Sequence, residues 1–136
     1  MKKIKKVVAF VAYNNNGQVL LVQRSETDNN FPNVWSLPSG TLEKEENYEK
    51  AVIRSVKEKL GIDVEIVRLI GEGEIERKKH VLHMKEYEIK IISGEISIDK
   101  NIEKYYQDWK WSDPDMLNEL VEKGSLCSKI YVENTK

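Results

Sequence analysis

The run from Gly40 to Ile62 constrains the fold more than any other part of the chain. Apolar residues recur in its second half at three- and four-residue steps, namely Tyr48, Ala51, Val52, Val56 and Leu60. This spacing is typical of the buried stripe of an amphipathic helix. Asn47 is a suitable N-cap for that helix, and Gly61 is a suitable left-handed stop. The run therefore predicts an acidic loop that leads into one helix, whose apolar stripe must pack against other elements.

The segments on both sides of this helix read as strands. Residues 7–13 and 18–24 are rich in β-branched side chains and are joined by Asn and Gly residues, which predicts a hairpin. Further strands are expected over 64–70, 80–92 and 95–98. A last helix is expected between Pro114 and Gly124. This order of elements favours an α+β fold with helices against a mixed sheet, in one domain over residues 1–136.

The composition excludes several classes of partner. The 136 residues include 33% charged residues, yet the net charge is −1, so no excess of positive charge favours a nucleic-acid partner. The apolar stretch at residues 7–13 is too short to cross a bilayer. The single cysteine, Cys127, cannot form an internal disulfide, which is typical of a reducing compartment. We therefore expect a cytoplasmic protein without a membrane or nucleic-acid partner.

Charged residues in and before the predicted helix point to a phosphate or metal site. Arg54 and Glu58 stand four residues apart, so they share one face of the helix. Glu43, Glu45 and Glu46 precede the helix, where several carboxylates can converge on one hard cation. The planar fork of the arginine suits either a carboxylate or a phosphate oxygen. A solvated helix face with an ordinary Glu–Arg pair is the competing interpretation.

The flanking residues favour the functional interpretation. The lead-in Trp-Ser-Leu-Pro-Ser-Gly at 35–40 is followed by a run in which Gly, Glu, Arg, Val, Glu, Gly and Ile occupy fixed positions. Those positions are Gly40, Glu46, Arg54, Val56, Glu58, Gly61 and Ile62. Together they resemble the Nudix phosphohydrolase signature, G-x5-E-x7-R-E-U-x-E-E-x-G-U, where U is a bulky aliphatic residue. The resemblance implies a Nudix-type α/β/α sandwich with a mixed β-sheet and a loop-helix-loop motif.

The resemblance also implies a function and the residues that carry it. We expect a hydrolase that uses Mg²⁺ or Mn²⁺ to cleave the pyrophosphate bond of a nucleoside diphosphate linked to another group. The expected catalytic residues are Glu46, Arg54 and Glu58, the expected metal ligands are Gly40, Glu46 and Glu58, and the expected substrate contacts are Arg24, Ser39 and Lys59. Glu46 and Arg54 are expected to pair and hold the loop against the helix. Dimers are frequent in the family, so a homodimer is a further expectation.

Two departures from the signature fall at positions important for metal binding. Ser55 and Lys59 stand where the family has glutamates, so one carboxylate is lost and another is replaced by a cation. Two unit charges about 4 Å apart interact by roughly 4 kcal/mol at an effective dielectric near 20. The lysine therefore opposes a dication at the expected site.

Two outcomes are open at this point. In the first, carboxylates of other segments rebuild a metal site, and the chain is a weak or atypical hydrolase. The candidates are Glu72, Glu74, Glu76, Glu103 and Asp108. In the second, the ammonium of Lys59 replaces the metal and pairs with Glu58 or Glu46. The chain is then a nucleotide-binding or regulatory module without turnover.

Overall fold

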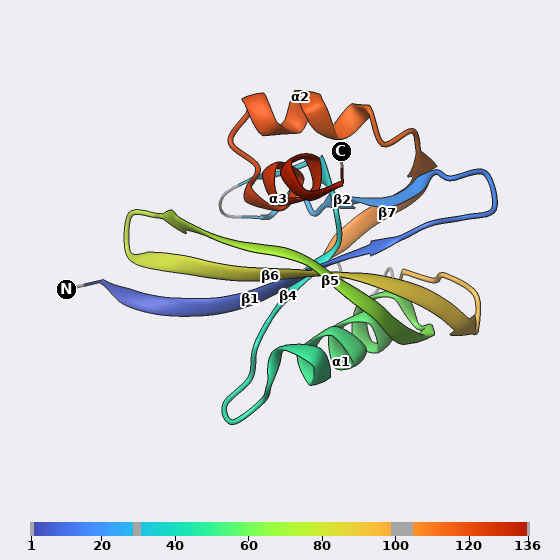
Figure 1. The fold of residues 1–136 in the computed structure, drawn as a ribbon, viewed down its shortest axis with the longest axis horizontal. Helices are drawn as coiled ribbons and strands as arrows, with labels where there is room; N and C mark the ends of the chain where they lie inside the picture. Colours follow the sequence, from blue (N-terminus) through green and yellow to red (C-terminus); the bar gives the residue numbers. More distant parts are fainter. Residues whose placement is uncertain (1, 29–30, 99–104, 136) are drawn as a thin grey trace.

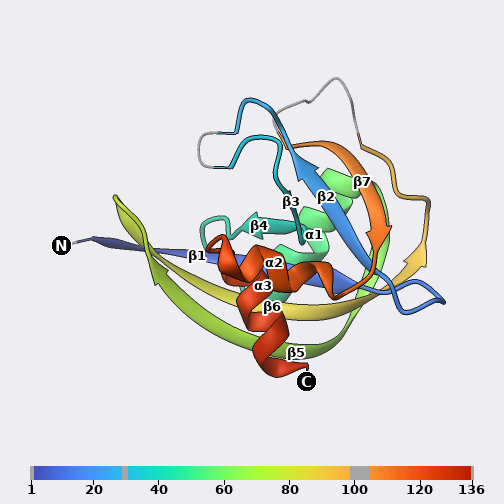
Figure 2. The same cartoon turned by 90° about the horizontal axis from the view of Figure 1, so that it is seen from above.

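Two β-sheets flanked by helices make up the fold in the computed structural model, which describes residues 2–28, 31–98 and 105–135 (Figures 1 and 2). The elements are β1 (Lys3–Ala12), β2 (Val19–Arg24), β3 (Trp35–Ser36), β4 (Ser39–Thr41), α1 (Tyr48–Leu60), β5 (Asp63–Glu76), β6 (His80–Ser93), β7 (Tyr106–Ser112), α2 (Met116–Glu122) and α3 (Leu126–Asn134). The larger sheet has the strand order β4-β1-β6-β5, and the smaller one has the order β3-β2-β7.

The larger sheet is mixed, as the sequence predicts. Strand β1 runs antiparallel to β4 and parallel to β6, and β6 runs antiparallel to β5. Helix α1 lies on one face of this sheet, while α2 and α3 lie on the other (Figure 1). The layers form the predicted α/β/α sandwich of the α+β class.

Each face of the larger sheet has its own apolar core. On the α1 side, the core includes Phe10 of β1 and Val56 and Leu60 of α1. On the α2 and α3 side, it includes Leu117 and Ile130. Strand β1 contributes to both cores because helices cover both faces, and its residues 7–12 are all buried. Each fully buried Leu, Phe or Val side chain contributes about 1.5–3 kcal/mol to folding.

Helix α1 forms where the apolar stripe predicts it. The side chain of Asn47 accepts a hydrogen bond from the backbone N of Lys50 at 2.8 Å, which caps the start of the helix. Gly61 ends it with φ 71°, a left-handed conformation that glycine adopts without a steric penalty. The helix therefore begins and ends at the predicted residues. These boundaries fix the direction in which Arg54, Ser55, Glu58 and Lys59 project from it.

The prediction of a hairpin over 7–24 is wrong in its pairing. The turn forms, with Gly17 at φ 74°, but β1 joins the larger sheet and β2 the smaller one. The two strands meet only at the bridge between Tyr13 and Val19. Strand β1 is apolar on both faces and takes an inner position between β4 and β6, because that position buries both faces.

The structure differs from the prediction at three further places. Residues 95–98, expected as a strand, form none, and Ile96 and Ile98 instead pack against the α1-side core. Strand β7 and helix α3 were not predicted. Helix α3 starts at the N-cap Ser125, whose side chain accepts a hydrogen bond from Ser128, just after Gly124 at φ 91° has ended α2. No helix in the described ranges has the length and apolar character needed to span a bilayer.

Candidate functional site

Arg54 of α1 gathers three carboxylates of the loop-helix motif. Its Nε lies 2.7 Å from Oε2 of Glu46 and 2.9 Å from Oε1 of Glu43, and its Nη1 lies 3.0 Å from Oε2 of Glu58. Its Nη2 donates to Oε1 of Glu46 at 2.9 Å and to the carbonyl O of Thr41 at 2.8 Å. The predicted Glu46–Arg54 pair is therefore present, and it ties the loop to the helix.

This pairing changes the acid–base properties of both partners. Hydrogen bonds from Arg54 lower the pKa of Glu46, and hydrogen bonding to Glu46 raises the pKa of Arg54. The side chain of Glu46 is only 13% exposed, whereas that of Glu58 is 49% exposed. Glu46 is thus a structural partner of the arginine, and Glu58 is the carboxylate with the freer access to solvent.

The loop before the helix adopts a backbone conformation that is unusual for its residue type. Glu45 has φ 66°, in the left-handed region that side chains other than glycine seldom adopt. The backbone N of Glu46 donates to the carbonyl O of Glu43 at 3.0 Å, and Oε1 of Glu46 accepts from the backbone N of Glu43 at 2.9 Å. These bonds close the turn and hold Glu45 in that conformation.

Ser55, the first departure from the signature, is a packing residue in this structure. It is 1% exposed, and its Oγ has no hydrogen-bond partner. A Cβ placed on Gly40 would lie only 2.8 Å from the Cβ of Ser55, and its closest neighbour would be the Oγ of Ser55. Strand β4 and helix α1 therefore approach each other closely at this pair, and Gly40 is required for that contact.

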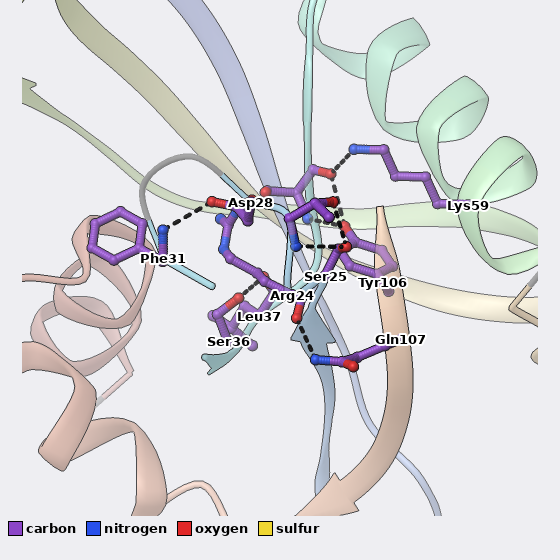
Figure 3. A network of polar contacts seen from close by, with 11 residues as sticks. Arg24, Ser25, Asp28, Phe31, Ser36, Leu37, Lys59, Tyr106 and Gln107 are labelled. Atoms are coloured by element: carbon purple, nitrogen blue, oxygen red, sulfur yellow. Dashed lines mark hydrogen bonds and ion pairs between the residues drawn. The ribbon is translucent and has the colours of Figure 1, made fainter. Parts of the chain in front are cut away.

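Lys59, the second departure, reaches from α1 to Ser39, the first residue of β4. Its Nζ donates to the carbonyl O of Ser39 at 2.7 Å (Figure 3). The same Nζ lies 4.9 Å from the ring centroid of Tyr105 and 5.6 Å from that of Tyr106. The Tyr106 hydroxyl accepts from the backbone N of Ser39 and donates to its carbonyl O, both at 3.1 Å. Lys59 and Tyr106 thus hold the same peptide unit.

The environment of Lys59 lowers its affinity for protons. Burial lowers the pKa of Lys59 to about 8, and the positive charges of Arg24 and Arg54 add to this effect. The expectation that Lys59 pairs with Glu58 or Glu46 is wrong, because Arg54 holds both carboxylates and the ammonium bonds a neutral carbonyl instead. Burial also raises the pKa of Tyr106 to about 12, so this hydroxyl keeps its proton.

A cavity of about 550 Å³ opens between these elements, and Lys59, Ser39 and Gly40 lie in its wall. Its lining includes seven lysine and arginine residues, which are Lys5, Arg24, Lys59, Arg77, Lys78, Lys79 and Lys123. None of the described residues that line it is Asp or Glu. The cavity therefore carries a concentrated positive charge in a chain whose net charge is −1.

Aromatic and apolar side chains form the rest of the wall. Two guanidinium groups lie over the ring of Phe31, that of Arg24 at 5.9 Å and that of Arg77 at 5.5 Å from the ring centroid. Arg24 also pairs with Asp28 at 3.3 Å (Figure 3). Trp35, Leu82 and Met84 are among the other lining residues. All three expected substrate contacts lie in this wall, namely Arg24, Ser39 and Lys59.

The donor set does not fit a divalent metal ion. No group of three or more His, Cys, Asp and Glu side chains within the described ranges is arranged to hold one. Glu46 and Glu58, the expected side-chain ligands, are bound to Arg54, and Lys59 places an ammonium beside Gly40. A hard cation needs converging oxygen ligands, which this arrangement does not offer.

The acidic residues proposed to rebuild a metal site have other partners. Glu72 and Glu74 of β5 lie 3.6 and 3.8 Å from the ring nitrogens of His83, and Glu76 pairs with Lys2 at 2.7 Å. Asp108 of β7 accepts a hydrogen bond from the backbone N of Trp109. Glu103, the last of these candidates, lies outside the described residues.

Sequence reasoning missed two components of the site. Tyr106 lies in β7, a strand that the sequence analysis did not predict, and it was not among the expected site residues. The basic run Arg-Lys-Lys-His at 77–80 lines the cavity, with residues 77–79 in the turn between β5 and β6 and His80 at the start of β6. Four consecutive basic or imidazole side chains were a visible signal, but nothing local shows that this turn lies beside residues 24 and 59.

Comparison with known proteins gives these features a family context. The family model described as NUDIX domain matches residues 3–129. The chain is 38% identical over 63 residues to Nudix hydrolase 5 of Arabidopsis thaliana, which covers 46% of this chain and 20% of that protein. It is 29% identical over 110 residues to Nucleoside triphosphatase NudI of Escherichia coli, which covers 76% and 78%. The chain spans 20% or less of the length of the first curated relatives that it matches.

A solved structure shows the same architecture. The MutT NUDIX hydrolase from Burkholderia pseudomallei superposes with a TM-score of 0.80 at 20% identity, over 99% of this chain and 100% of that one. At this identity the likeness concerns the fold alone. The family match, by contrast, extends over nearly all of the sequence and includes the loop-helix motif described above. The chain therefore belongs to the Nudix family, whose members are pyrophosphohydrolases.

Proposed function

We propose that the cavity binds a nucleoside diphosphate derivative through its phosphate groups. The observation that carries this proposal is the lining of seven Lys and Arg side chains without a described carboxylate. Lysine binds phosphate as a point charge, and arginine binds it through a planar fork. The volume of about 550 Å³ lies within the range of small-molecule sites, roughly 300–1,000 Å³.

The apolar part of the wall supports a nucleoside as the other half of the ligand. Phe31, Trp35 and Met84 line the same cavity as the cations. Aromatic faces stack on nucleobases and contribute about 1–3 kcal/mol per base in nucleic-acid complexes. A ligand with an aromatic base at one end and phosphates at the other would use both parts of the wall.

Calorimetric titration of the purified chain with ADP and with adenosine tests this function. ADP should bind, and adenosine should bind at least about tenfold more weakly, since it lacks the charges that the cations recognise. Arg24→Gln should weaken ADP binding, because Arg24 lines the cavity. Arg68→Gln is the matched control, since Arg68 pairs with Glu88 and does not line the cavity. Equal affinity for ADP and adenosine would contradict the proposal.

Hydrolysis of the bound pyrophosphate is the second candidate function. It is supported by membership of a family of pyrophosphohydrolases and by the relative named as a nucleoside triphosphatase. The chain also keeps Glu46, Arg54 and Glu58 in the register of the signature. For Glu58 to act on a substrate, its carboxylate must leave Arg54, and its 49% exposure permits that movement. Glu46 and Arg54 would keep the loop in position.

Product release from ATP, CTP and ADP-ribose, assayed with Mg²⁺ and with Mn²⁺, tests this second function. Turnover that disappears in Glu58→Gln and persists in Glu49→Gln would support it, because Glu49 is an exposed residue of the first turn of the same helix. Turnover that is unchanged in Glu58→Gln would remove Glu58 from the proposed mechanism. ADP binding without turnover would leave the cavity as a receptor.

A further inference from the structure

We infer that phosphate binding in this cavity requires no divalent cation, because Lys59 provides a fixed positive charge beside Ser39 and Gly40. This inference rests on the proposed function, since it concerns how the same cavity holds its phosphates. It has three supports: the uncompensated charge of Lys59, its free hydrogen-bond donors and the absence of ligands for a competing metal.

The charge of Lys59 is not neutralised by the motif to which it belongs. Three carboxylates of the loop-helix motif, those of Glu43, Glu46 and Glu58, are all bound to Arg54. No ion pair links Lys59 to a carboxylate in the part of the chain that the structure describes. A ligand phosphate would therefore meet an uncompensated ammonium.

The ammonium is also held in place by contacts that leave donors free. Lysine has three N–H donors, and the hydrogen bond to the carbonyl O of Ser39 uses one. The rings of Tyr105 and Tyr106 hold the cation by cation–π interaction at 4.9 and 5.6 Å without using a conventional acceptor. Two donors are thus available to phosphate oxygens.

The described lining of the cavity offers no carboxylate ligand to a divalent ion. The described lining offers cations and neutral groups, with Lys59 and Arg24 both in the wall. An incoming dication would be repelled by these charges and would find no carboxylate in the lining to bind. The charge that balances the phosphates is therefore part of the protein, and removal of free metal should leave the affinity unchanged.

The first test is calorimetric titration of the full chain with ADP and with inorganic pyrophosphate, in EDTA and in excess Mg²⁺. The affinity in EDTA should equal or exceed that in Mg²⁺, since a Mg²⁺-bound phosphate carries less negative charge. Mg²⁺ added without nucleotide should give no binding heat. These measurements use the unmodified protein, so they do not depend on the folding of any variant.

The second test compares two lysines of the same helix. Lys59→Met should weaken ADP binding in EDTA by at least about tenfold, which corresponds to about 1.4 kcal/mol. Lys59→Arg should retain most of the affinity, because it keeps the charge. Lys57→Met is the matched control, since Lys57 is exposed and pairs with Asp63 away from the cavity. Thermal unfolding of each variant reports whether the fold is intact.

The outcomes separate this inference from the proposed function. Binding that is lost in EDTA and restored by Mg²⁺ would overturn the inference and leave the proposed function standing. Equal losses in Lys57→Met and Lys59→Met would also overturn it. Absence of ADP binding under both conditions would refute the proposed function, and the inference with it.

Discussion

Helix α1 contributes one cation to each of two charged regions, and the charges of these regions are arranged differently. On the side of Arg54, one cation binds three carboxylates, so the charges of the motif are paired within the protein. On the side of Lys59, seven cations line a cavity without a carboxylate in its described lining, and of these Arg24 pairs with Asp28. The two residues belong to the same helix, yet Arg54 stabilises the loop and Lys59 contributes to a binding surface.

This contrast shows why a motif must be judged by the partners of its residues. Glu46 and Glu58 occupy the positions that the family uses for chemistry, but both are held by the arginine of the same motif. Ser55 and Lys59 stand where the signature has its other two glutamates. Ser55 packs against Gly40 instead of offering a carboxylate. In this structure, Glu46 and Glu58 therefore bind Arg54, and the Glu46–Arg54 pair ties the loop to the helix.

The largest expected effect concerns the close contact between Gly40 of β4 and Ser55 of α1. Gly40→Ala should destabilise the fold by about 2–3 kcal/mol, because the added methyl group would overlap Ser55. Urea unfolding measures the loss as a lower midpoint at an unchanged m-value. Adding Ser55→Gly should recover part of it, beyond the cost of about 1 kcal/mol for glycine within a helix. Strictly additive losses would show that the two residues do not interact.

The next largest effect is expected when Arg54, the cation that binds the three carboxylates, is replaced. Arg54→Met should cost on the order of 2 kcal/mol of unfolding free energy, since Glu46 loses its main partner while 13% exposed. Arg68→Met is a suitable control, because Arg68 and Glu88 form a more exposed pair that contributes about 1 kcal/mol or less. If the two variants unfold at the same urea concentration, the ion pairs of Arg54 contribute no more to stability than an exposed pair does.

A smaller effect, of opposite sign, concerns a carboxyl group that lies in neither region. Glu86 of β6 is fully buried, and neither of its oxygens has a hydrogen-bond partner. Glu86→Met should therefore stabilise the fold at pH 7 by about 1–2 kcal/mol, since it removes an uncompensated buried polar group. Glu86→Gln keeps an unsatisfied amide in the same place and should gain less.

The pH dependence of stability provides a separate check on Glu86. Burial raises its pKa well above the ordinary value of 4.5, so the folded state binds a proton that the unfolded state releases. Its contribution to stability is complete below pH 4.5 and is lost as the pH rises towards the folded-state pKa. Urea unfolding across this range should show a falling midpoint in the wild type that is reduced in Glu86→Met.

The smallest expected effect lies at the rim of the cavity. Lys78→Met should weaken ADP binding by about two- to threefold, because Lys78 is exposed and its charge is screened by salt. Raising the salt concentration should reduce the difference between variant and wild type. Lys90→Met, on an exposed position of β6 that does not line the cavity, should bind ADP like the wild type.

Much of the fold could be predicted from local pattern. The stripe of α1, the cap at Asn47 and the stop at Gly61 are encoded within a few residues, and the structure confirms them. The partner of β1 could not be predicted in the same way. Its neighbours β4 and β6 are remote in sequence, and the choice depends on burying both faces of the strand, which is a property of the whole sheet.

The sequence predicted which residues lie at the candidate site better than it predicted which of them pair with each other. Arg24, Ser39 and Lys59 were expected near the substrate, and all three line the cavity, although their role stays a proposal. The partner of Lys59 was predicted wrongly, because charge alone suggests a carboxylate and Arg54 competes for both candidates with a better geometry. The basic run at 77–80 was missed because the tertiary fold brings it to the cavity from a distant strand pair.

The parallel pairing of β1 with β6 also sets an order of events during synthesis. Lys3 lies opposite His80 and Ala12 opposite Ile89, so the first long strand to be made must wait for one of the last. Until β6 emerges, the apolar residues of β1 have no strand beside them on that edge. Non-local pairings of this kind slow folding and prolong the exposure of unpaired strands. Strand β1 therefore keeps one edge unpaired, with apolar residues along it, until β6 has been made.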